Sequence, residues 1–136
     1  MEEKAFRIKS ISSSSWIEFG ELRKWDDDIY FRFAARFDHF SGVVGSSTLF
    51  AGSPAGAFLE ASASWRSWES DKVWQALDGE LSIRIVGDVL GGRYVEIVMV
   101  AGNEKLQGSI SLDAEALESA ANGLRDLFDQ ITELAQ

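Results

Sequence analysis

The one histidine of the chain sits in a turn that also holds a hydroxyl and a carboxyl group. His39 follows Asp38 and precedes Ser41 in the stretch DHFSG. These are the residue types of a serine–histidine–aspartate triad, but that triad requires side chains that converge from different directions. Neighbours within one short turn do not converge in this way. The pattern therefore predicts a solvent-exposed turn histidine and not a catalytic base.

Two groups of acidic residues are the remaining candidates for chemistry. Asp26, Asp27 and Asp28 lack the spaced oxygen ligands of a calcium loop, so a solvated acidic turn is expected. Glu69 and Asp71 could in principle serve as acid and base in a hydrolase, yet acidic residues near aromatic rings are common without catalysis. The sequence has no cysteine and no phosphate-binding glycine motif. We expect no catalytic residues, no metal site and no cofactor, and so not an enzyme.

The charge balance restricts the partners. Thirteen Lys and Arg residues against 22 Asp and Glu residues leave a net charge of −9 in 136 residues. A field of this sign opposes binding to nucleic acid and to anionic membranes, and it attracts a basic protein. The N-terminal stretch MEEKAFRIKS has no apolar leader region, and no run approaches the roughly 18 apolar residues of a membrane span. We expect a single domain over residues 1–136, located in the cytoplasm.

The first fifty residues have the alternation of β-strands. Residues 6–11 and 16–22 alternate around a run of four serines, which predicts a hairpin. The clearest strand follows the acidic turn. It places Ile29, Phe31, Phe33, Ala35 and Phe37 on one face, and Tyr30, Arg32, Ala34, Arg36 and Asp38 on the other. A period of two this regular indicates one buried and one solvated face. Residues 43–50 are expected to return as a fourth strand.

A helix is expected over residues 54–64, with Ser53 as its N-cap and Pro54 at its first position. Residues 79–89 and 93–102 predict two strands around Gly91 and Gly92, and strict pairing across a two-residue turn would require a bulge at Gly87. A last strand is expected at 106–112.

The chain ends in an amphipathic pattern. Asp113 is the expected N-cap, and an apolar stripe follows at helical spacing: Leu117, Ala120, Ala121, Leu124, Phe128 and Ile131. The order of elements predicts an α+β fold: an antiparallel sheet of about seven strands, with one mid-chain and one C-terminal helix packed on it.

Three of the five tryptophans fall within the stretch SWRSWESDKVW, residues 64–74. We interpret Trp68 and Trp74 as structural brackets that fasten the helix to the sheet, because large aromatics in small domains are mostly buried. The neighbouring residues Trp65, Glu69, Asp71 and Lys72 are left as a candidate partner-binding rim, together with the acidic run at Asp26, Asp27 and Asp28.

The stretch from Ala57 to Ile85 resembles a pattern in small bacterial proteins of unknown function that are related to WapI-type immunity proteins. The residues that carry the resemblance are Phe58, Leu59, Trp68, Trp74, Leu77, Gly79 and Leu81. The similarity extends through GGRYVEIVMV to the C-terminal helix and covers roughly residues 57–130. It implies an α+β sandwich and, for the immunity branch, neutralisation of a cognate toxin.

Three hypotheses for the function follow. The first is an acidic immunity-like module that occludes a basic toxin protein without catalysis, acting as a monomer or weak dimer. The second is a small-molecule binder or enzyme with a pocket between sheet and helices, lined by Trp65, Tyr30 or Tyr94. The third is a structural oligomer that uses an exposed sheet face or edge.

Overall fold

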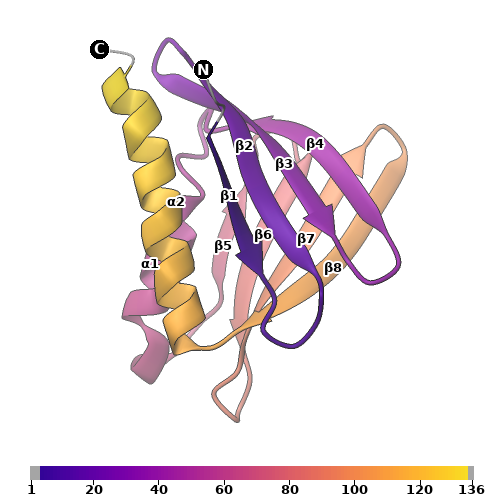
Figure 1. The fold of residues 1–136 in the computed structure, drawn as a ribbon, viewed down its shortest axis with the longest axis vertical. Coiled ribbons are helices and arrows are strands. Elements are labelled where there is room, and N and C mark those ends of the chain that lie inside the picture. Colours follow the sequence, from indigo (N-terminus) through magenta and orange to yellow (C-terminus); the bar gives the residue numbers. More distant parts are fainter. Residues whose placement is uncertain (1–3, 135–136) are drawn as a thin grey trace.

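The structure is a computed structural model that describes residues 4–134, in which two four-stranded antiparallel sheets pack with two α-helices (Figure 1). The first sheet contains β1 (Ala5–Lys9), β2 (Trp16–Trp25), β3 (Asp28–Arg36) and β4 (Ser41–Ser47). The second contains β5 (Lys72–Gln75), β6 (Leu81–Gly87), β7 (Arg93–Ala101) and β8 (Glu104–Leu112). The helices are α1 (Ala55–Ala63) and α2 (Ala114–Leu134), and one 3₁₀ turn covers Trp65–Ser67.

The predicted α+β class with antiparallel strands and two helices is confirmed, but the single sheet of seven strands is wrong. Eight strands form two separate meanders, and each meander is followed by a helix. The missed strand is β5, which lies inside the tryptophan stretch. It was missed because its four residues, KVWQ, are too few and too mixed in polarity to give a periodic signal.

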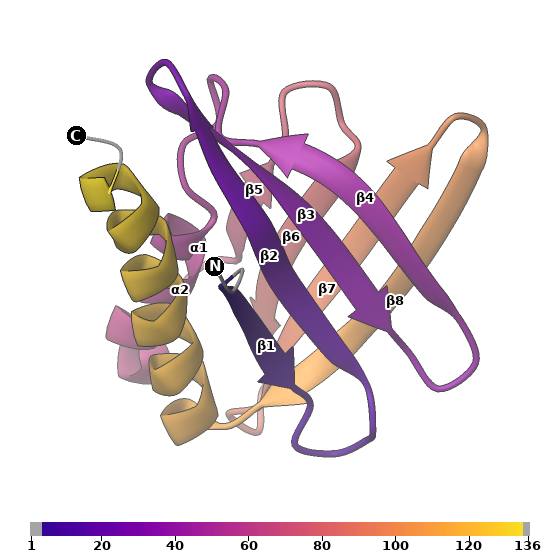
Figure 2. The same cartoon turned by 45° about the horizontal axis from the view of Figure 1, so that its top comes forward.

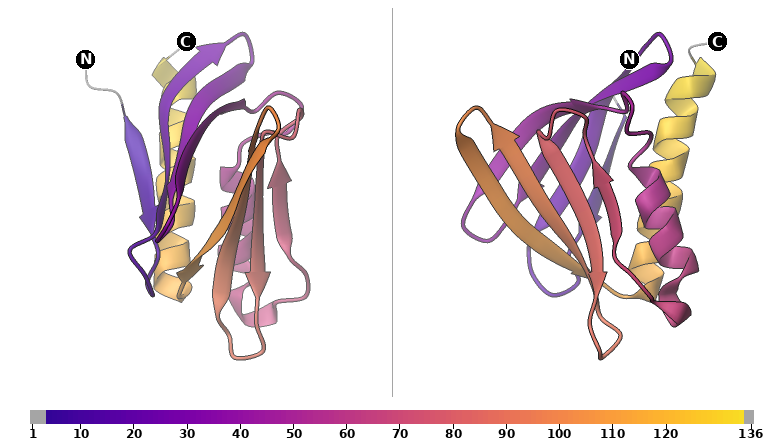
Figure 3. Two further views of the ribbon diagram at one scale, coloured as in Figure 1. Left: turned by 90° about the vertical axis from the view of Figure 1, so that its right-hand side faces the viewer. Right: turned by 180° about the vertical axis from the view of Figure 1, so that it is seen from behind.

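The inner faces of the two sheets pack on each other, and their strands cross obliquely (Figure 2). The predicted inner face of β3 is confirmed, since Ile29, Phe31, Phe33 and Ala35 are all buried. The two helices lie side by side along one side of the sandwich (Figure 3). There α1 contacts β5 and β6 of the second sheet, and α2 contacts β1 and β2 of the first. Because the two helices also contact each other, the pair joins the two sheets.

An aromatic cluster connects three elements at the centre of the core. The ring of Phe31 on β3 lies 6.1 Å from the ring of Trp74 on β5 and 5.5 Å from that of Phe128 on α2. Phe19 on β2 packs edge-on against Phe33 at 5.1 Å. Edge-to-face aromatic pairs at these distances stabilise beyond their buried area.

The ends of the helices follow local chemistry. The carboxylate of Asp113 accepts a hydrogen bond from the backbone N–H of Ala116 at 2.7 Å, which confirms the predicted cap of α2. Helix α1 begins at Ala55, so the predicted cap is wrong: Pro54 and not Ser53 is the N-cap, and no side chain caps this end. The hydroxyl of Ser53 accepts a hydrogen bond from the N–H of Ala55 at 3.2 Å. None of the helices in the described part of the chain is long and apolar enough to cross a membrane.

The bulge expected at Gly87 is wrong. Gly87 pairs directly with Arg93, and a five-residue loop at 88–92 aligns the apolar faces that a two-residue turn would have offset. Gly87 serves another purpose, because a Cβ atom there would lie 2.8 Å from the indole nitrogen of Trp68. The glycine lets the tryptophan ring pack directly on the strand.

Gly123 tests the packing of β1 against α2. A Cβ atom at Gly123 would lie 2.2 Å from the ring of Phe6, so we expect Gly123→Ala to displace that ring. Overpacking costs about 1–3 kcal/mol and the better helix propensity of alanine returns about 1 kcal/mol, so the net loss of unfolding free energy should be about 0–2 kcal/mol. Gly56→Ala in α1 is the matched control, because the added Cβ meets nothing within 4 Å. It should stabilise by about 0.5–1 kcal/mol in urea unfolding. A stabilising Gly123→Ala would contradict the packing.

Candidate binding face

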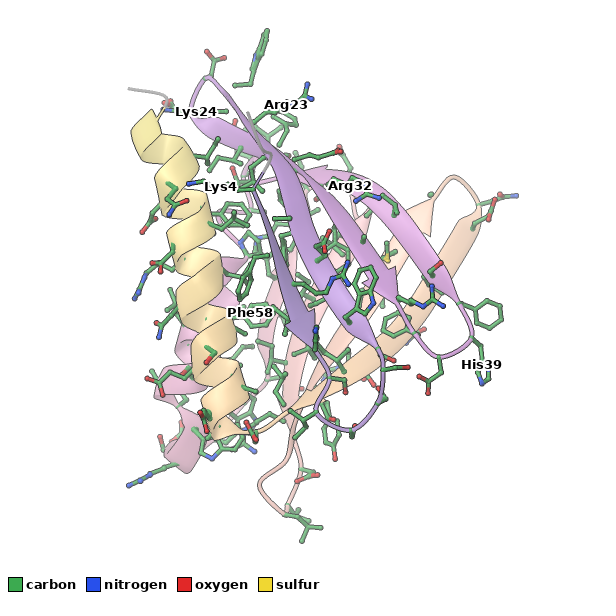
Figure 4. All side chains as sticks on the ribbon, viewed as in Figure 1. Lys4, Arg23, Lys24, Arg32, His39 and Phe58 are labelled. Atoms are coloured by element: carbon green, nitrogen blue, oxygen red, sulfur yellow. The ribbon has the colours of Figure 1, made fainter. Side chains whose placement is uncertain are left out.

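The outer face of the first sheet carries most of the basic side chains of that sheet. Because side chains alternate along a strand, the residues that oppose each other across β1 to β4 share one face. This places on the outside four arginines and a lysine with two carboxylates: Arg7, Lys9, Arg23, Arg32, Arg36, Glu18 and Asp28. Figure 4 shows Arg32 over the middle of the sheet and Arg23 near its upper end. We call this surface the arginine face.

Arg7 is held in place by two contacts. Its Nε donates a hydrogen bond to the carboxylate of Glu18 at 2.9 Å, and its guanidinium lies 3.7 Å from the centre of the Trp16 ring. A cation stacked on an indole ring gains roughly 0.5–1 kcal/mol at an exposed site. The only carboxylate at the centre of the face is therefore occupied by Arg7.

Arg32 and Arg36 form no ion pair or hydrogen bond with any described residue. Arg32 lies between Gly20 and Gly45 in the cross-strand register, and Arg36 lies between Trp16 and Ser41. The two glycines beside Arg32 leave its guanidinium group room to move, and Arg36 has the small side chain of Ser41 on one side and the ring of Trp16 on the other. Together with Arg7, Trp16 and Ala34, both arginines line a hollow of about 470 Å³ on the outside of the sheet.

The opposite charge gathers on the helices. The exposed side of α2 carries Glu115, Glu118, Asp126 and Asp129, and α1 adds Glu60. The one basic side chain described on α2, Arg125, is paired with Asp126. The net charge of −9 is therefore spread unevenly, and the arginine face is locally positive.

The tryptophan stretch folds around a buried arginine. Arg93 of β7 is 4% exposed, and its guanidinium lies 4.4 Å from the ring of Trp65 and 4.5 Å from that of Trp68. It donates hydrogen bonds to the carbonyl oxygens of Trp65 at 2.6 Å and of Gly92 at 3.0 Å. Trp74 is buried, and its indole N–H donates to the carbonyl of Gly52 at 2.9 Å. The predicted bracketing role of Trp68 and Trp74 agrees with these contacts, and Trp65 shares it.

The structure divides the predicted partner-binding residues between two ends of the molecule. Asp71 accepts a hydrogen bond from Arg84 at 3.0 Å, and Lys72 lies 5.5 Å from the ring of Trp68. Glu69 is exposed beside them. Asp26, Asp27 and Asp28 lie instead at the β2–β3 turn, near the C-terminal end of α2 (Figure 1). The tryptophan stretch follows the C-terminal end of α1, which lies at the opposite end of the molecule (Figure 1). The two groups do not form one surface.

His39 is exposed in the β3–β4 turn, as the sequence predicts, and it points away from the sheet (Figure 4). The carboxylate of Asp38 accepts hydrogen bonds from Ser14 and Ser15 at 3.4 and 3.5 Å. Among the described residues, no group of three or more His, Asp or Glu side chains is arranged to hold a metal ion.

Three exposed groups have shifted pKa values. The pKa of Asp88 lies below its ordinary value because the N–H of Gly92 and the hydroxyl of Tyr94 donate hydrogen bonds to its carboxylate. The same bond raises the pKa of Tyr94. The pKa of Arg84 is raised by its hydrogen bond and charge interaction with Asp71.

Sequence reasoning missed the arginine face, although the signal was present. The alternation of β3 assigns Arg32 and Arg36 to the solvated face. What it could not give was the register that brings Arg7 of β1 and Trp16 of β2 beside them.

No protein-family model matches the chain, and no curated protein matches it. Among solved structures, the chain is similar to a crystal structure of Trypanosoma brucei MRP1/MRP2, with a TM-score of 0.53. The match covers 100% of this chain and 90% of the other, at 11% sequence identity. What the two share is the fold. At this identity the likeness extends to the arrangement of the sheets and helices and not to the arginine face.

Arg93 tests the bracketing of the tryptophan stretch. We expect Arg93→Ala to lower the unfolding free energy by at least about 2 kcal/mol, since it removes two charged hydrogen bonds and two ring contacts. Arg66→Ala changes an exposed arginine in the same stretch and should shift stability by less than about 0.5 kcal/mol. Equal midpoints for both variants in urea unfolding would contradict this role.

Asp88 predicts a pH dependence. Because its folded pKa lies below the unfolded one, its carboxylate contributes stability above the ordinary pKa of about 3.9 and loses it as the pH falls through the folded pKa. Asp88→Asn keeps an oxygen acceptor without the charge. The difference in urea midpoint between the wild type and this variant should therefore shrink from about pH 6 to about pH 3. A difference that stays constant over this range would show that Asp88 does not titrate with folding.

Proposed function

We propose that the protein is a non-catalytic protein-binding module that holds an acidic partner protein on the arginine face. The observation that carries the proposal is the pair Arg32 and Arg36, which lie on a hollowed sheet surface without an internal partner. Both lie over β3 on the outer face of the first sheet, whereas the acidic side chains of the helices lie along one side of the sandwich (Figure 3).

The chemistry of the face suits carboxylates. A guanidinium group is planar and can donate two parallel hydrogen bonds to one carboxylate, which gives geometric selectivity as well as attraction. The floor of the hollow is formed by small residues such as Ala34, so a carboxylate can approach closely. The ring of Trp16 adds an apolar wall, and tryptophan and arginine are enriched at the energetic centres of protein interfaces.

The net charge of the protein affects the rate at which such a partner associates. At a net charge of −9 the molecule repels an acidic partner at long range, and only within about one Debye length, roughly 8 Å at physiological salt, does the arginine face dominate. We therefore expect a modest association rate and an affinity that depends on the close contacts.

A second candidate keeps the immunity role that the resemblance to WapI-type proteins implies. It is supported by the exposed carboxylates of α2 and α1, which would face a basic toxin. The small-molecule alternative has less support, because Tyr30 and Tyr94 lie on the outer faces of different sheets and do not line one pocket.

Charge-reversal variants distinguish the two surfaces. The tagged protein is used to capture partners from lysate of its source organism, after nuclease treatment, and the captured proteins are identified by mass spectrometry. We expect an acidic protein to be retained by the wild type and by Glu118→Lys/Asp129→Lys, and lost from Arg32→Glu/Arg36→Glu. Both variants replace two exposed charges, so each serves as the control for the other. A basic protein that is lost only from the helix variant would support the second candidate. Capture that is seen in a parallel sample without nuclease and is lost after nuclease treatment would contradict both.

A further inference from the structure

Strand β4 is an edge without the usual protection. It pairs only with β3, and its sequence, SGVVGSS, contains no charge and no proline. The other edges are different. Strand β1 is five residues long and packs against α2, and β5 contacts α1. Strand β8 carries Glu104 and Lys105, and the backbone of its residue Ser111 is hydrogen-bonded to the β1–β2 loop. Natural proteins normally block a flat edge, because its unpaired backbone groups accept another strand.

The hydrogen bonds between β3 and β4 show which backbone groups of β4 point to its free edge. The N–H of Thr48 donates to the carbonyl of Ile29 at 3.0 Å, and the N–H of Phe37 donates to the carbonyl of Phe40 at 2.8 Å. Hydrogen-bonded pairs alternate in an antiparallel ladder, so the even-numbered residues of β4 face β3. The N–H and C=O groups of Ser41, Val43 and Gly45 therefore point to the free edge, and all three residues are exposed.

One side of this edge belongs to the arginine face. Arg32 lies directly opposite Gly45, and Arg36 lies opposite Ser41. Neighbouring strands are about 4.8 Å apart, and with such short side chains in between, both arginines can extend across β4 to its edge. Carboxylates on a strand added there would meet them, at two positions that are four residues apart in its sequence.

The other side of the edge is an apolar groove. Between β4 and the β7–β8 hairpin lies a hollow of about 330 Å³, lined by Phe40, Val44, Met99, Ala101 and Leu106, with Glu104 and Lys105 also on its wall. Phe40 is 71% exposed and lies at the start of β4. Side chains of an added strand that point inward would enter this groove, because alternate residues of a strand face opposite sides.

We propose that the edge of β4 binds an extended segment of the acidic partner as a fifth strand, in which acidic residues alternate with apolar ones. The acidic residues meet Arg32 and Arg36, the apolar ones fill the groove beside Met99 and Leu106, and the backbone pairs with Ser41, Val43 and Gly45. This inference rests on the proposed function and specifies its partner. Hydrogen bonds to the backbone groups of the edge provide the affinity. The arginines on one side of the edge and the apolar groove on the other fix the register of the added strand.

The probe is a fluorescently labelled seven-residue peptide of alternating Glu and Val, measured by anisotropy at physiological ionic strength, where the repulsion by the net charge is screened. The first control is a peptide of the same composition with the Glu and Val residues in separate blocks. The second is the alternating peptide with N-methyl groups on the residues that would pair with β4, which removes backbone donors and leaves the protein unchanged. We expect the alternating peptide to bind at least about tenfold more tightly than either control.

Two protein variants separate this inference from the proposed function. Val43→Pro removes an edge N–H without removing a β3–β4 hydrogen bond, and Arg32→Gln/Arg36→Gln removes the charges. Both should weaken binding of the alternating peptide at least about tenfold. If the block and N-methylated peptides bind as well as the alternating one, and only the arginine variant weakens binding, the edge inference is wrong and the arginine face still holds an acidic partner. If none of the peptides binds, the edge inference is overturned, and the capture experiment decides the proposed function independently. A scattering mass well above 15.0 kDa that Val43→Pro returns to the monomer value would instead assign the edge to a second copy of the chain and overturn the inference.

Discussion

The aromatic contacts of Phe31 are the constraint on which the rest of the structure depends. One ring on β3 meets Trp74 of the second sheet and Phe128 of α2, so three elements that are distant in sequence are fixed at a single point. Burial of this ring commits its whole strand face to the core. Because successive side chains of a strand point to opposite faces, Arg32 and Arg36 then point outward. The packing of the core and the position of the arginine face therefore both follow from the same strand register.

The distribution of charge matters more to this protein than its sum. A net charge of −9 describes the molecule at long range, where salt already screens much of the field. Close to the first sheet the local charge is positive, because five basic side chains share its outer face with two carboxylates. The expectation of a basic partner rests on the net charge and on the resemblance to WapI-type immunity proteins. The arginine face and the acidic helix layer favour partners of opposite sign, and each surface can be altered without the other.

Local sequence patterns predicted most of the helices and strands. Features that depend on contacts between distant parts of the sequence were not predicted. The alternation at 29–37 and the capped amphipathic helix after Asp113 are properties of neighbouring residues, so the sequence contains them fully. The division into two sheets depends on β5, whose four residues become a strand through pairing with β6 and through burial of Trp74 against Phe31. The sandwich of Arg93 between Trp65 and Trp68 joins residues 28 and 25 positions apart, and nothing local to Arg93 signals it. The arginine face was not predicted for the same reason, since it depends on the pairing register of three strands.

The most direct test of the account is amide hydrogen exchange of the protein, measured alone and with its captured partner. The central claim is that the partner occupies the arginine face and the adjoining edge of β4. In the free protein the amides of Val43 and Gly45 should exchange rapidly while that of Val44 is protected, because only the latter faces β3. With the partner bound, the account predicts new protection at Val43 and Gly45. Protection that appears on α2, with β4 unchanged, would contradict it.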